Sequence, residues 1–539
     1  MKKLGKNKHL FSRIGVGSLR LFEVGVLILL VMSIGNLFFN SSQYRRIVPI
    51  DQVQVLIWIA LFFILLWAGE FFLTHWKKCR IFFVKHKISI MVAGTIFLFL
   101  FQLWFAKNTY TEIGWDCSTV VLQGDPEGDP FYFLTYPNNI LLAFLYKAAN
   151  HLAYLFGIYN VWAVCIGVNI LFLDLGIVFG MLACKKLLPT RGYYLSFVLM
   201  ISVVGLSPYL TVPYSDTMAL PFPAAIFFFL LLYREQQILW KKAVLAFFLG
   251  AATLMGYWIK PTVVIVWIAY GIWLLLKKKG KMDKTAFLRF SSAVGAFILG
   301  LGMVIGIQNL AKEKILGPYN QQVLFYENEI PMTHFMMMGL YDEGGLFGAY
   351  YGKDLDTTKS IQGKKEKIFY NLLVIRQRLT DYGFTGFLQH LYHKYIWITT
   401  DGTFFYGGEG HFHRDIPKTE TGVRGLLQNF TYCETPFYQQ YYGQYLHAIW
   451  AFLLFGNAWY AFISVRKKGI GMEFVMQMSI LGLFLFLLLF EARSRYLFLY
   501  LPFFILLASR GILGLKSGMQ NKLFRKRKTH TQYRSNSGR

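Results

Sequence analysis

The residue best suited to acid–base chemistry is Asp116, in the sequence Gly-Trp-Asp-Cys-Ser that follows an apolar stretch ending at residue 106. The loop 107–137 around it carries five acidic residues and a single base, Lys107. A carboxylate beside Trp115 has an aromatic wall, and partial burial there suits a general base at a membrane surface. Aspartates are also frequent in loops because they favour turns. Position alone leaves both interpretations open.

Three cations stand where a membrane protein seldom places them. Lys260 lies within the apolar stretch YWIKPTVV, and Arg493 and Arg495 lie between the last two apolar stretches, in FEARSRYLFLYLPFF. A guanidinium binds phosphate through paired hydrogen bonds, so these residues indicate an anionic ligand. The alternatives are an internal ion pair of one arginine with Glu491, and a Lys260 side chain that reaches the membrane surface.

A second carboxylate, Asp216, lies in a proline-rich turn, SPYLTVPYSDTMALPFP. Ser215 and Asp216 precede an apolar run, which is typical of a helix N-cap. If Asp216 instead lies at the same depth in the membrane as Asp116, the two carboxylates would share a cavity. The sequence leaves both roles open.

The sequence gives little indication of a metal site or of a disulfide. Four histidines, His390, His393, His411 and His413, lie in the long outer region 312–440. The pair in HFH has no further ligand at a matching spacing, so we expect no cofactor and no metal centre, with a divalent metal ion as the alternative. Five cysteines show no CxxC spacing, and Cys117 and Cys433 would pair only if both face outward.

The chain that carries these residues is a membrane protein. Of its 539 residues 55% are hydrophobic, and its mean hydropathy is +0.42. Apolar runs such as 21–39, 53–73 and 479–492 recur along it, and runs of this kind cross a bilayer. The net charge of +27 is concentrated in short loops, which follows the positive-inside rule and argues against nucleic acid as a partner.

Basic loops mark the cytoplasmic side, so an even number of spans must separate consecutive basic loops. The interval between Lys87 and Lys185 holds three apolar segments. We expect the segment 138–157, which polar residues interrupt, to lie in the membrane interface as an amphipathic helix. The prediction is an all-α fold with about 12 transmembrane helices, both termini in the cytoplasm and the acidic loop outside.

This threading divides the chain into four parts. Residues 1–311 form a membrane module with the acidic outer loop 107–137 and the interfacial helix 138–157. Residues 312–440 form a mixed extracellular region, which is long enough for a fold of its own and contains a helix over 364–383. Residues 441–515 are the last transmembrane helices, and 516–539 are a basic tail that faces lipid headgroups in the cytoplasm.

Four short motifs, GWDCS, TYPNN, PYSDT and EARSRYLFLYLPFF, together resemble those of the GT-C superfamily of polytopic glycosyltransferases. The nearer likeness is to the protein O-mannosyltransferase and aminoarabinose-transferase group, which uses polyprenyl-phosphate sugars. Two features depart from that pattern. Two extra spans precede the acidic loop, and Cys117 stands where the family often has a second acid.

The resemblance implies an inverting glycosyltransferase on the extracellular face of the cell membrane. Its partners would be a polyprenyl-phosphate sugar and an acceptor that is an envelope glycan, teichoic acid, lipid or protein. Asp116 would be the general base, and Arg493, Arg495 and Lys260 would hold the phosphate. On the acceptor side the supporting residues would be Trp115, Tyr136, Asp216 and Glu491.

A second catalytic carboxylate is not required, because a phosphate leaves without a general acid. Two other functions remain open from the sequence. A transporter or flippase of lipid-linked envelope precursors would show internal repeats and broken helices near the bilayer midplane. A non-catalytic scaffold in wall assembly would use 312–440 as its interaction surface.

Overall fold

The computed structural model describes residues 2–39, 44–123, 132–276, 284–317, 327, 329–408, 421–466 and 471–515. These residues are predominantly helical, as the sequence predicts. The sheet in this part of the chain has two short antiparallel strands, β1 (Asp342–Glu343) and β2 (Leu346–Phe347). His411, His413, most of the acidic residues of 107–137 and the basic tail lie outside the described residues.

Nine helices in the described ranges are long and apolar enough to cross a membrane. Three shorter apolar helices, over 190–205, 261–276 and 473–489, accompany them, and the total of about 12 spans stays a prediction. The nine long spans come from α1 (Lys2–Phe39), α2 (Gln52–His75), α4 (Lys87–Thr109), α8 (Val161–Leu187), α10 (Ser215–Met218) with α11 (Pro221–Glu235), α12 (Leu239–Ile259), α14 (Lys284–Leu316), the π-helix η7 (Tyr438–Tyr442) with α20 (Gly443–Ser464), and residues 494–515.

The remaining elements are shorter. In the first third of the chain they are α3 (Lys77–Lys85), α5 (Trp115–Leu122), α6 (Tyr132–Thr135), η2 (Pro137–Asn139) and α7 (Ile140–Tyr154). Within the membrane part they are α9 (Thr190–Met200), η3 (Ile201–Gly205), η4 (Pro208–Thr211), η5 (Pro261–Val264), α13 (Ile265–Leu276), α21 (Glu473–Leu489) and η8 (Ser494–Tyr500). Between α14 and η7 they are α16 (Met332–Met338), α17 (Gly352–Ser360), α18 (Lys364–Thr399) and α19 (Gly422–Gln428).

Helix α7 occupies the centre of the segment 138–157. Its 15 residues give a length of about 22 Å, which is short of the ~30 Å of a bilayer core. Its contacts are with α8, α14 and α5, and several of its apolar residues are fully buried. Its length agrees with a helix that does not span, and its place in the interface stays a prediction.

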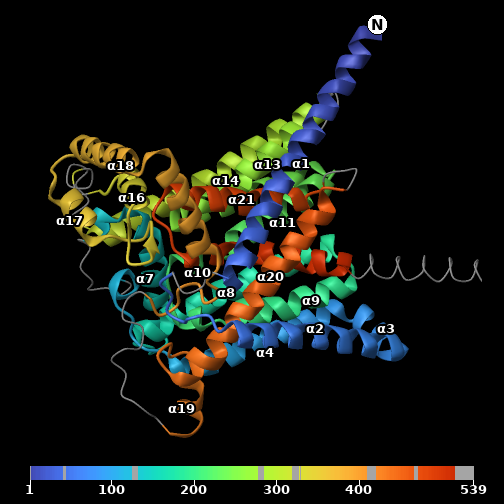
Figure 1. The fold of residues 1–539 in the computed structure, drawn as a ribbon, viewed down its shortest axis with the longest axis horizontal. Coiled ribbons are helices and arrows are strands. Elements are labelled where there is room, and N and C mark those ends of the chain that lie inside the picture. Colours follow the sequence, from blue (N-terminus) through green and yellow to red (C-terminus); the bar gives the residue numbers. More distant parts are fainter. Residues whose placement is uncertain are drawn as a thin grey trace, which may run out of the picture.

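The region 312–440 does not have a hydrophobic core of its own in the described residues. Helix α14 runs on to Leu316, and Tyr395, Ile396 and Phe404 belong to the same hydrophobic cluster as the membrane helices. Helix α18 continues past the predicted end at 383 and bends there, because Gly383 has the left-handed φ of 59° that glycine tolerates. Figure 1 shows α16, α17 and α18 gathered on one side of the molecule and α3 on the opposite side.

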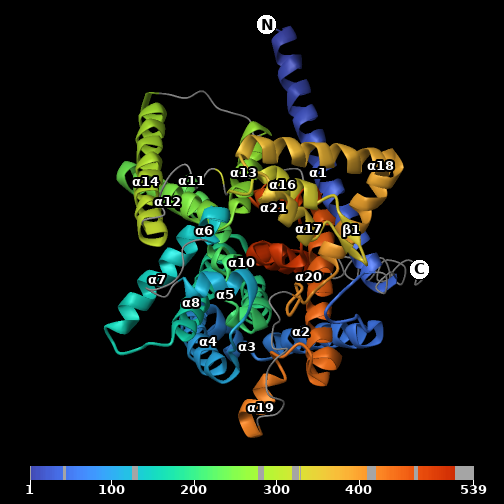
Figure 2. The same ribbon diagram turned by 90° about the vertical axis from the view of Figure 1, so that its left-hand side faces the viewer.

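Glycines allow each helix next to a candidate cation to pack closely against a neighbouring helix. A Cβ on Gly511, in the last helix, would lie 1.9 Å from the backbone oxygen of Gly456 in α20. A Cβ on Gly250 in α12 would lie 2.2 Å from the Phe297 oxygen in α14. Backbones in membranes approach this closely only where side chains are absent. The last helix and α20 are each 78% buried over their apolar windows, so this end of the chain forms the centre of the bundle (Figure 2).

Candidate active site

Asp116 lies in the first turn of α5, where a carboxylate interacts favourably with the exposed N–H groups of the helix. Its side chain is exposed, and both of its oxygens accept hydrogen bonds from phenols. Tyr132 donates to Oδ1 at 2.9 Å, and Tyr214 donates to Oδ2 at 3.1 Å. Asn139 in turn donates to the Tyr132 oxygen at 2.9 Å. The carboxylate is therefore oriented by neutral donors while it stays accessible.

Cys117, next to Asp116, has a packing role. Its buried thiol donates to the backbone oxygen of Pro213 at 3.6 Å, which ties α5 to the segment that leads to Tyr214. Burial raises the pKa of the Cys117 thiol, so the residue stays neutral. Cys117 and Cys433 are not joined by a disulfide.

Asp216 is the anionic centre of the cationic group, and its surroundings correct two interpretations of the sequence. It lies inside α10, whose N-cap is Tyr214, so Asp216 is not a cap. Its side chain is 3% exposed and pairs with the Lys260 ammonium and, at 3.2 Å, with Arg495 Nε. Lys260 therefore does not extend to the membrane surface, because its charge is held by a buried carboxylate.

Glu491 and Arg493 complete this group. Arg493 Nε lies 4.0 Å from Glu491 Oε1, so the internal pair predicted as one alternative is present. The Tyr496 hydroxyl donates to the same Glu491 oxygen at 3.2 Å. Burial raises the pKa of Glu491, and Arg493 acts against this rise. Burial lowers the pKa of Lys260, and Asp216 acts against that fall.

We call Lys260, Arg493, Arg495, Asp216 and Glu491 the cation cluster. Its formal charges are three positive and two negative. Aromatic rings face the cations, with the Lys260 ammonium 4.1 Å from the centre of the Tyr496 ring and the Arg493 guanidinium 5.0 Å from that of Phe405. The cluster is thus a buried, net cationic group with apolar walls, which is suited to an anion that brings its own negative charge.

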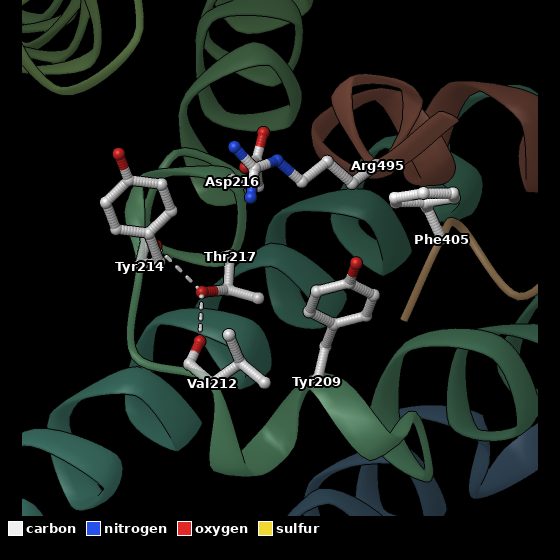
Figure 3. Close-up of a pocket in the computed structure, with 7 residues that line it drawn as sticks. All are labelled: Tyr209, Val212, Tyr214, Asp216, Thr217, Phe405 and Arg495. Atoms are coloured by element: carbon white, nitrogen blue, oxygen red, sulfur yellow. Dashed lines mark hydrogen bonds and ion pairs between the residues drawn. The ribbon is translucent and has the colours of Figure 1, made fainter. Parts of the chain in front are cut away.

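Tyr214 joins the cluster to Asp116. Its hydroxyl donates to Asp116, while the centre of its ring lies 5.4 Å from the Arg495 guanidinium. A small cavity of about 10 Å³, the size of one water molecule, lies between Tyr209, Val212, Tyr214, Asp216, Thr217, Phe405 and Arg495. Figure 3 shows the Arg495 and Asp216 side chains meeting at one side of it. Asp116 and the Arg495 guanidinium are therefore separated by one tyrosine side chain.

Aromatic residues line the other side of Asp116. The rings of Tyr136 and Tyr132 lie 4.9 Å apart, and the Lys359 ammonium of α17 lies 5.5 Å from the centre of the Tyr136 ring. Burial and then the nearby Asp116 charge raise the pKa of Tyr136. Trp115 is 52% exposed. Trp115 is therefore exposed beside the carboxylate, Tyr136 packs against the Tyr132 ring, and Asp216 and Glu491 lie with the cations.

Backbone strain is concentrated around this site. Among described residues other than glycine, positive φ occurs at Trp115 (58°), Phe404 (55°) and Phe405 (59°). Trp115 precedes Asp116, and Phe405 lines the cavity beside Arg495. Such conformations cost about 1–3 kcal/mol each and occur preferentially at functional sites.

Asp401 stabilises the second strained turn, and the sequence analysis did not identify it. Its Oδ2 accepts hydrogen bonds from the Phe405 amide at 2.7 Å and from the Ser494 hydroxyl at 2.9 Å. Ser494 stands between the two arginines. The signal in the sequence is the Asp-Gly pair of TTDGTFF, which marks a turn but gives no partner.

Lys394 is a second residue that the sequence did not single out. Its side chain is fully buried in α18, and Nζ donates to the carbonyl oxygens of Gly339, Leu488 and Phe490 at 2.7, 3.1 and 2.6 Å. Two of these oxygens belong to the C-terminal end of α21, directly before Glu491. Burial lowers the pKa of Lys394 to about 7, with Glu491 acting against the fall. Lys394 therefore fixes the segment from which the arginines follow.

The histidines make structural contacts. His390 Nε2 bonds to the Gly339 oxygen at 3.1 Å, and its Nδ1 lies 3.3 Å from Asp342. Within the described ranges no group of three or more His, Cys, Asp or Glu side chains is arranged to hold a metal ion. A metal-free site stays a prediction for the whole chain.

Comparison with known proteins gives a family and two distant structures. A family model described as "Conserved hypothetical integral membrane protein" matches residues 12–512. No curated protein matches the sequence. The structure is similar to that of ArnT from Cupriavidus metallidurans in the apo state, with a TM-score of 0.32 and 12% identity over 79% of this chain and 77% of that chain. For ArnT bound to undecaprenyl phosphate the values are 0.30, 10%, 80% and 78%. Likenesses at this level carry no argument about function.

Proposed function

The chain belongs to the family of conserved hypothetical integral membrane proteins, and from its site we propose that it is a glycosyltransferase that uses a polyprenyl-phosphate sugar. One observation carries the proposal. An accessible carboxylate, Asp116, is oriented by two phenols and stands one tyrosine away from a buried, net cationic cluster. A base beside an anion site is what transfer from a phosphate-linked donor requires.

The cation cluster is the proposed site of the donor phosphate. Arg493, Arg495 and Lys260 supply the positive charge, while Asp216 and Glu491 hold these side chains in place. Charge builds up on the phosphate as the glycosidic bond breaks, and fixed cations in a buried setting stabilise it. A lipid-linked donor suits this position, because Lys260 and Arg495 lie at the ends of candidate membrane spans.

The proposed reaction is a single displacement. The acceptor hydroxyl oxygen forms a bond to the anomeric carbon as the bond from that carbon to the phosphate oxygen breaks. Asp116 takes the hydroxyl proton, and the electron pair of the broken bond stays with the phosphate. The configuration is inverted, and no general acid takes part because the phosphate leaves as an anion.

Asp116 is a better candidate for the base than Asp216. The Asp116 side chain is exposed and its hydrogen-bond partners are neutral. Asp216 is 3% exposed, and its oxygens face Lys260 and Arg495. An acceptor hydroxyl reaches Asp116 past Trp115 and Tyr136, which form the proposed acceptor side. The acceptors that fit carry a free hydroxyl, as envelope glycans, teichoic acids, lipids and proteins do.

The test is a donor panel assayed with the protein in nanodiscs. We expect at least one undecaprenyl-phosphate-linked hexose or amino sugar to be consumed with release of undecaprenyl phosphate. Arg495→Ala should lose binding of undecaprenyl phosphate, whereas Arg80→Ala, an exposed arginine of α3, should retain it. If undecaprenyl phosphate binds equally well to both variants, the assignment of the cluster to the donor is wrong.

A further inference from the structure

The first part of α18, before its bend at Gly383, exposes an apolar stripe. At helical spacing the stripe contains Phe369, Leu372, Leu373 and Leu379, and Phe384 and Leu388 follow beyond the bend. Phe369 is 66% exposed and Phe384 is 78% exposed. A stripe of large apolar side chains on a globular surface indicates a covering partner or an apolar medium.

The opposite face of the same helix is polar, and it packs inward. Lys367 donates to the Glu327 oxygen at 2.6 Å, and Asn371 donates to Thr333 at 3.2 Å. Arg378 forms two hydrogen bonds of 2.8 Å with Asp354 of α17. Before its bend, helix α18 thus holds Lys367, Asn371 and Arg378 in contacts with the protein, while four of its large apolar side chains are exposed, which is unusual for a helix on a soluble surface. An apolar medium outside the stripe accounts for this arrangement.

The second part of α18 fixes its height relative to the membrane. The Ser33 hydroxyl donates to Tyr395, and Tyr392 donates to Asn36, so this part runs antiparallel to the end of α1. Gly383 is nine residues beyond Tyr392, or about 14 Å, whereas α1 ends about 4.5 Å beyond Asn36. The bend therefore lies at most about 9 Å past the end of α1, a distance comparable to the ~5–8 Å thickness of a headgroup layer. Figure 2 shows the two parts of α18 meeting at a sharp bend on the edge of the molecule.

The charges on the exposed side suit the same place. Lys365 and Arg376 are exposed within the stripe, whereas Glu366, Gln377 and Asp381 follow one another along the adjacent strip. Cations on an exposed apolar face extend to lipid phosphates, as in helices that lie in a membrane surface. A neutral or acidic apolar face would fit a protein partner as well, and this pattern favours the lipid.

We infer that residues 364–388 form a membrane-surface helix whose partner is the bilayer leaflet on the side of the active site, with anionic phospholipid headgroups. This surface is distinct from the predicted interfacial helix 138–157 and does not depend on the proposed transfer reaction. It also has a consequence for the site. Arg378 and Tyr382 hold Asp354 and the Leu340 oxygen, so α18 holds the α16–α17 segment at a set height above the lipid.

The experiment measures depth rather than activity. A nitroxide is attached at Leu372→Cys in full-length protein that also carries Cys79→Ser, in nanodiscs of phosphatidylglycerol and phosphatidylethanolamine. The four remaining cysteines are buried. The control is Gln377→Cys, an exposed position on the polar strip of the same helix.

We expect the label at 372 to show a several-fold higher ratio of oxygen to nickel–chelate accessibility than the label at 377. Equal ratios at the two positions would place the stripe in water and overturn the proposal. Low accessibility to both reagents at 372 would show that a protein surface covers the stripe, and it would overturn the proposal as well.

Discussion

Replacement of Asp216 by Asn tests how the cation cluster is held together. The variant keeps the size of the side chain and removes its charge, so Lys260 and Arg495 are left as buried cations without their carboxylate. The two cationic side chains are only 13% and 15% exposed, so solvent screens little of this charge. Loss of one partner from a buried ion pair costs about 3–5 kcal/mol, and we expect Asp216→Asn to lower the free energy of unfolding by this amount.

The loss should depend on pH. Burial lowers the pKa of Lys260 below the unfolded value of about 10.4, and Asp216 acts against this fall, so the asparagine variant lowers it further. Because the pKa of Lys260 is lower in the folded than in the unfolded protein, folding releases a proton at pH values between these two pKa values. Stability therefore rises with pH across that window. The loss of unfolding free energy caused by Asp216→Asn should therefore be largest at neutral pH and smaller in the alkaline range.

Thermal unfolding followed with a thiol-reactive dye is a suitable assay, because four of the five cysteines are buried and become reactive only on unfolding. The control is Asp381→Asn, at an exposed position of α18. Asp216→Asn combined with Lys260→Met removes one stranded cation and should recover part of the loss. A cost below about 1 kcal/mol at pH 7, which is typical of exposed pairs, would refute the account of the cluster.

Three further changes probe other parts of the molecule. Lys394→Met leaves the carbonyls of Gly339, Leu488 and Phe490 without their donor. It should speed hydrogen exchange at the Glu491 and Ala492 amides and weaken binding of undecaprenyl phosphate. Unchanged exchange would contradict a positioning role. Gly511→Ala places a Cβ 1.9 Å from the Gly456 oxygen and should cost about 1–3 kcal/mol in thermal unfolding, whereas Gly306→Ala, whose Cβ meets nothing within 4 Å, should be neutral or stabilising. Tyr132→Phe removes one of the donors that orient Asp116, and it should lower kcat while binding of undecaprenyl phosphate is retained. Lost binding with a normal kcat would contradict the separate roles of Asp116 and the cation cluster.

The sequence was informative where a signal is local. Length and apolarity of the runs identify the membrane class, and the proximity of Glu491 and Arg493 in the chain gives one of the ion pairs. The amphipathic pattern after Tyr136 marks α7, although its bounds are shorter than predicted. These features depend on residues that are close together in the chain, and the period of the hydrophobic pattern and the local composition therefore indicate them.

The rest depends on contacts between distant residues. Asp216 pairs with a lysine 44 positions away, and Tyr214 bonds to a carboxylate 98 positions away. No local pattern separates Asp216 from an N-cap or Lys260 from a lysine at the membrane surface, because the deciding partner comes from another helix. Lys394 is similar, since its three acceptors are backbone carbonyls that carry no residue type. The sequence also did not predict the bend in α18, because a glycine inside a helical pattern is compatible with both the end of a helix and a kink.

The most direct test of the central claim is the initial rate of sugar transfer by Asp116→Asn, measured in nanodiscs with the undecaprenyl-phosphate sugar that the unmodified protein consumes. The account predicts a fall in kcat of about 10²–10⁴-fold, as expected for loss of a general base, with binding of undecaprenyl phosphate retained and Asp381→Asn unaffected. A transfer rate for Asp116→Asn equal to that of the unmodified protein would contradict the assignment of Asp116 as the base.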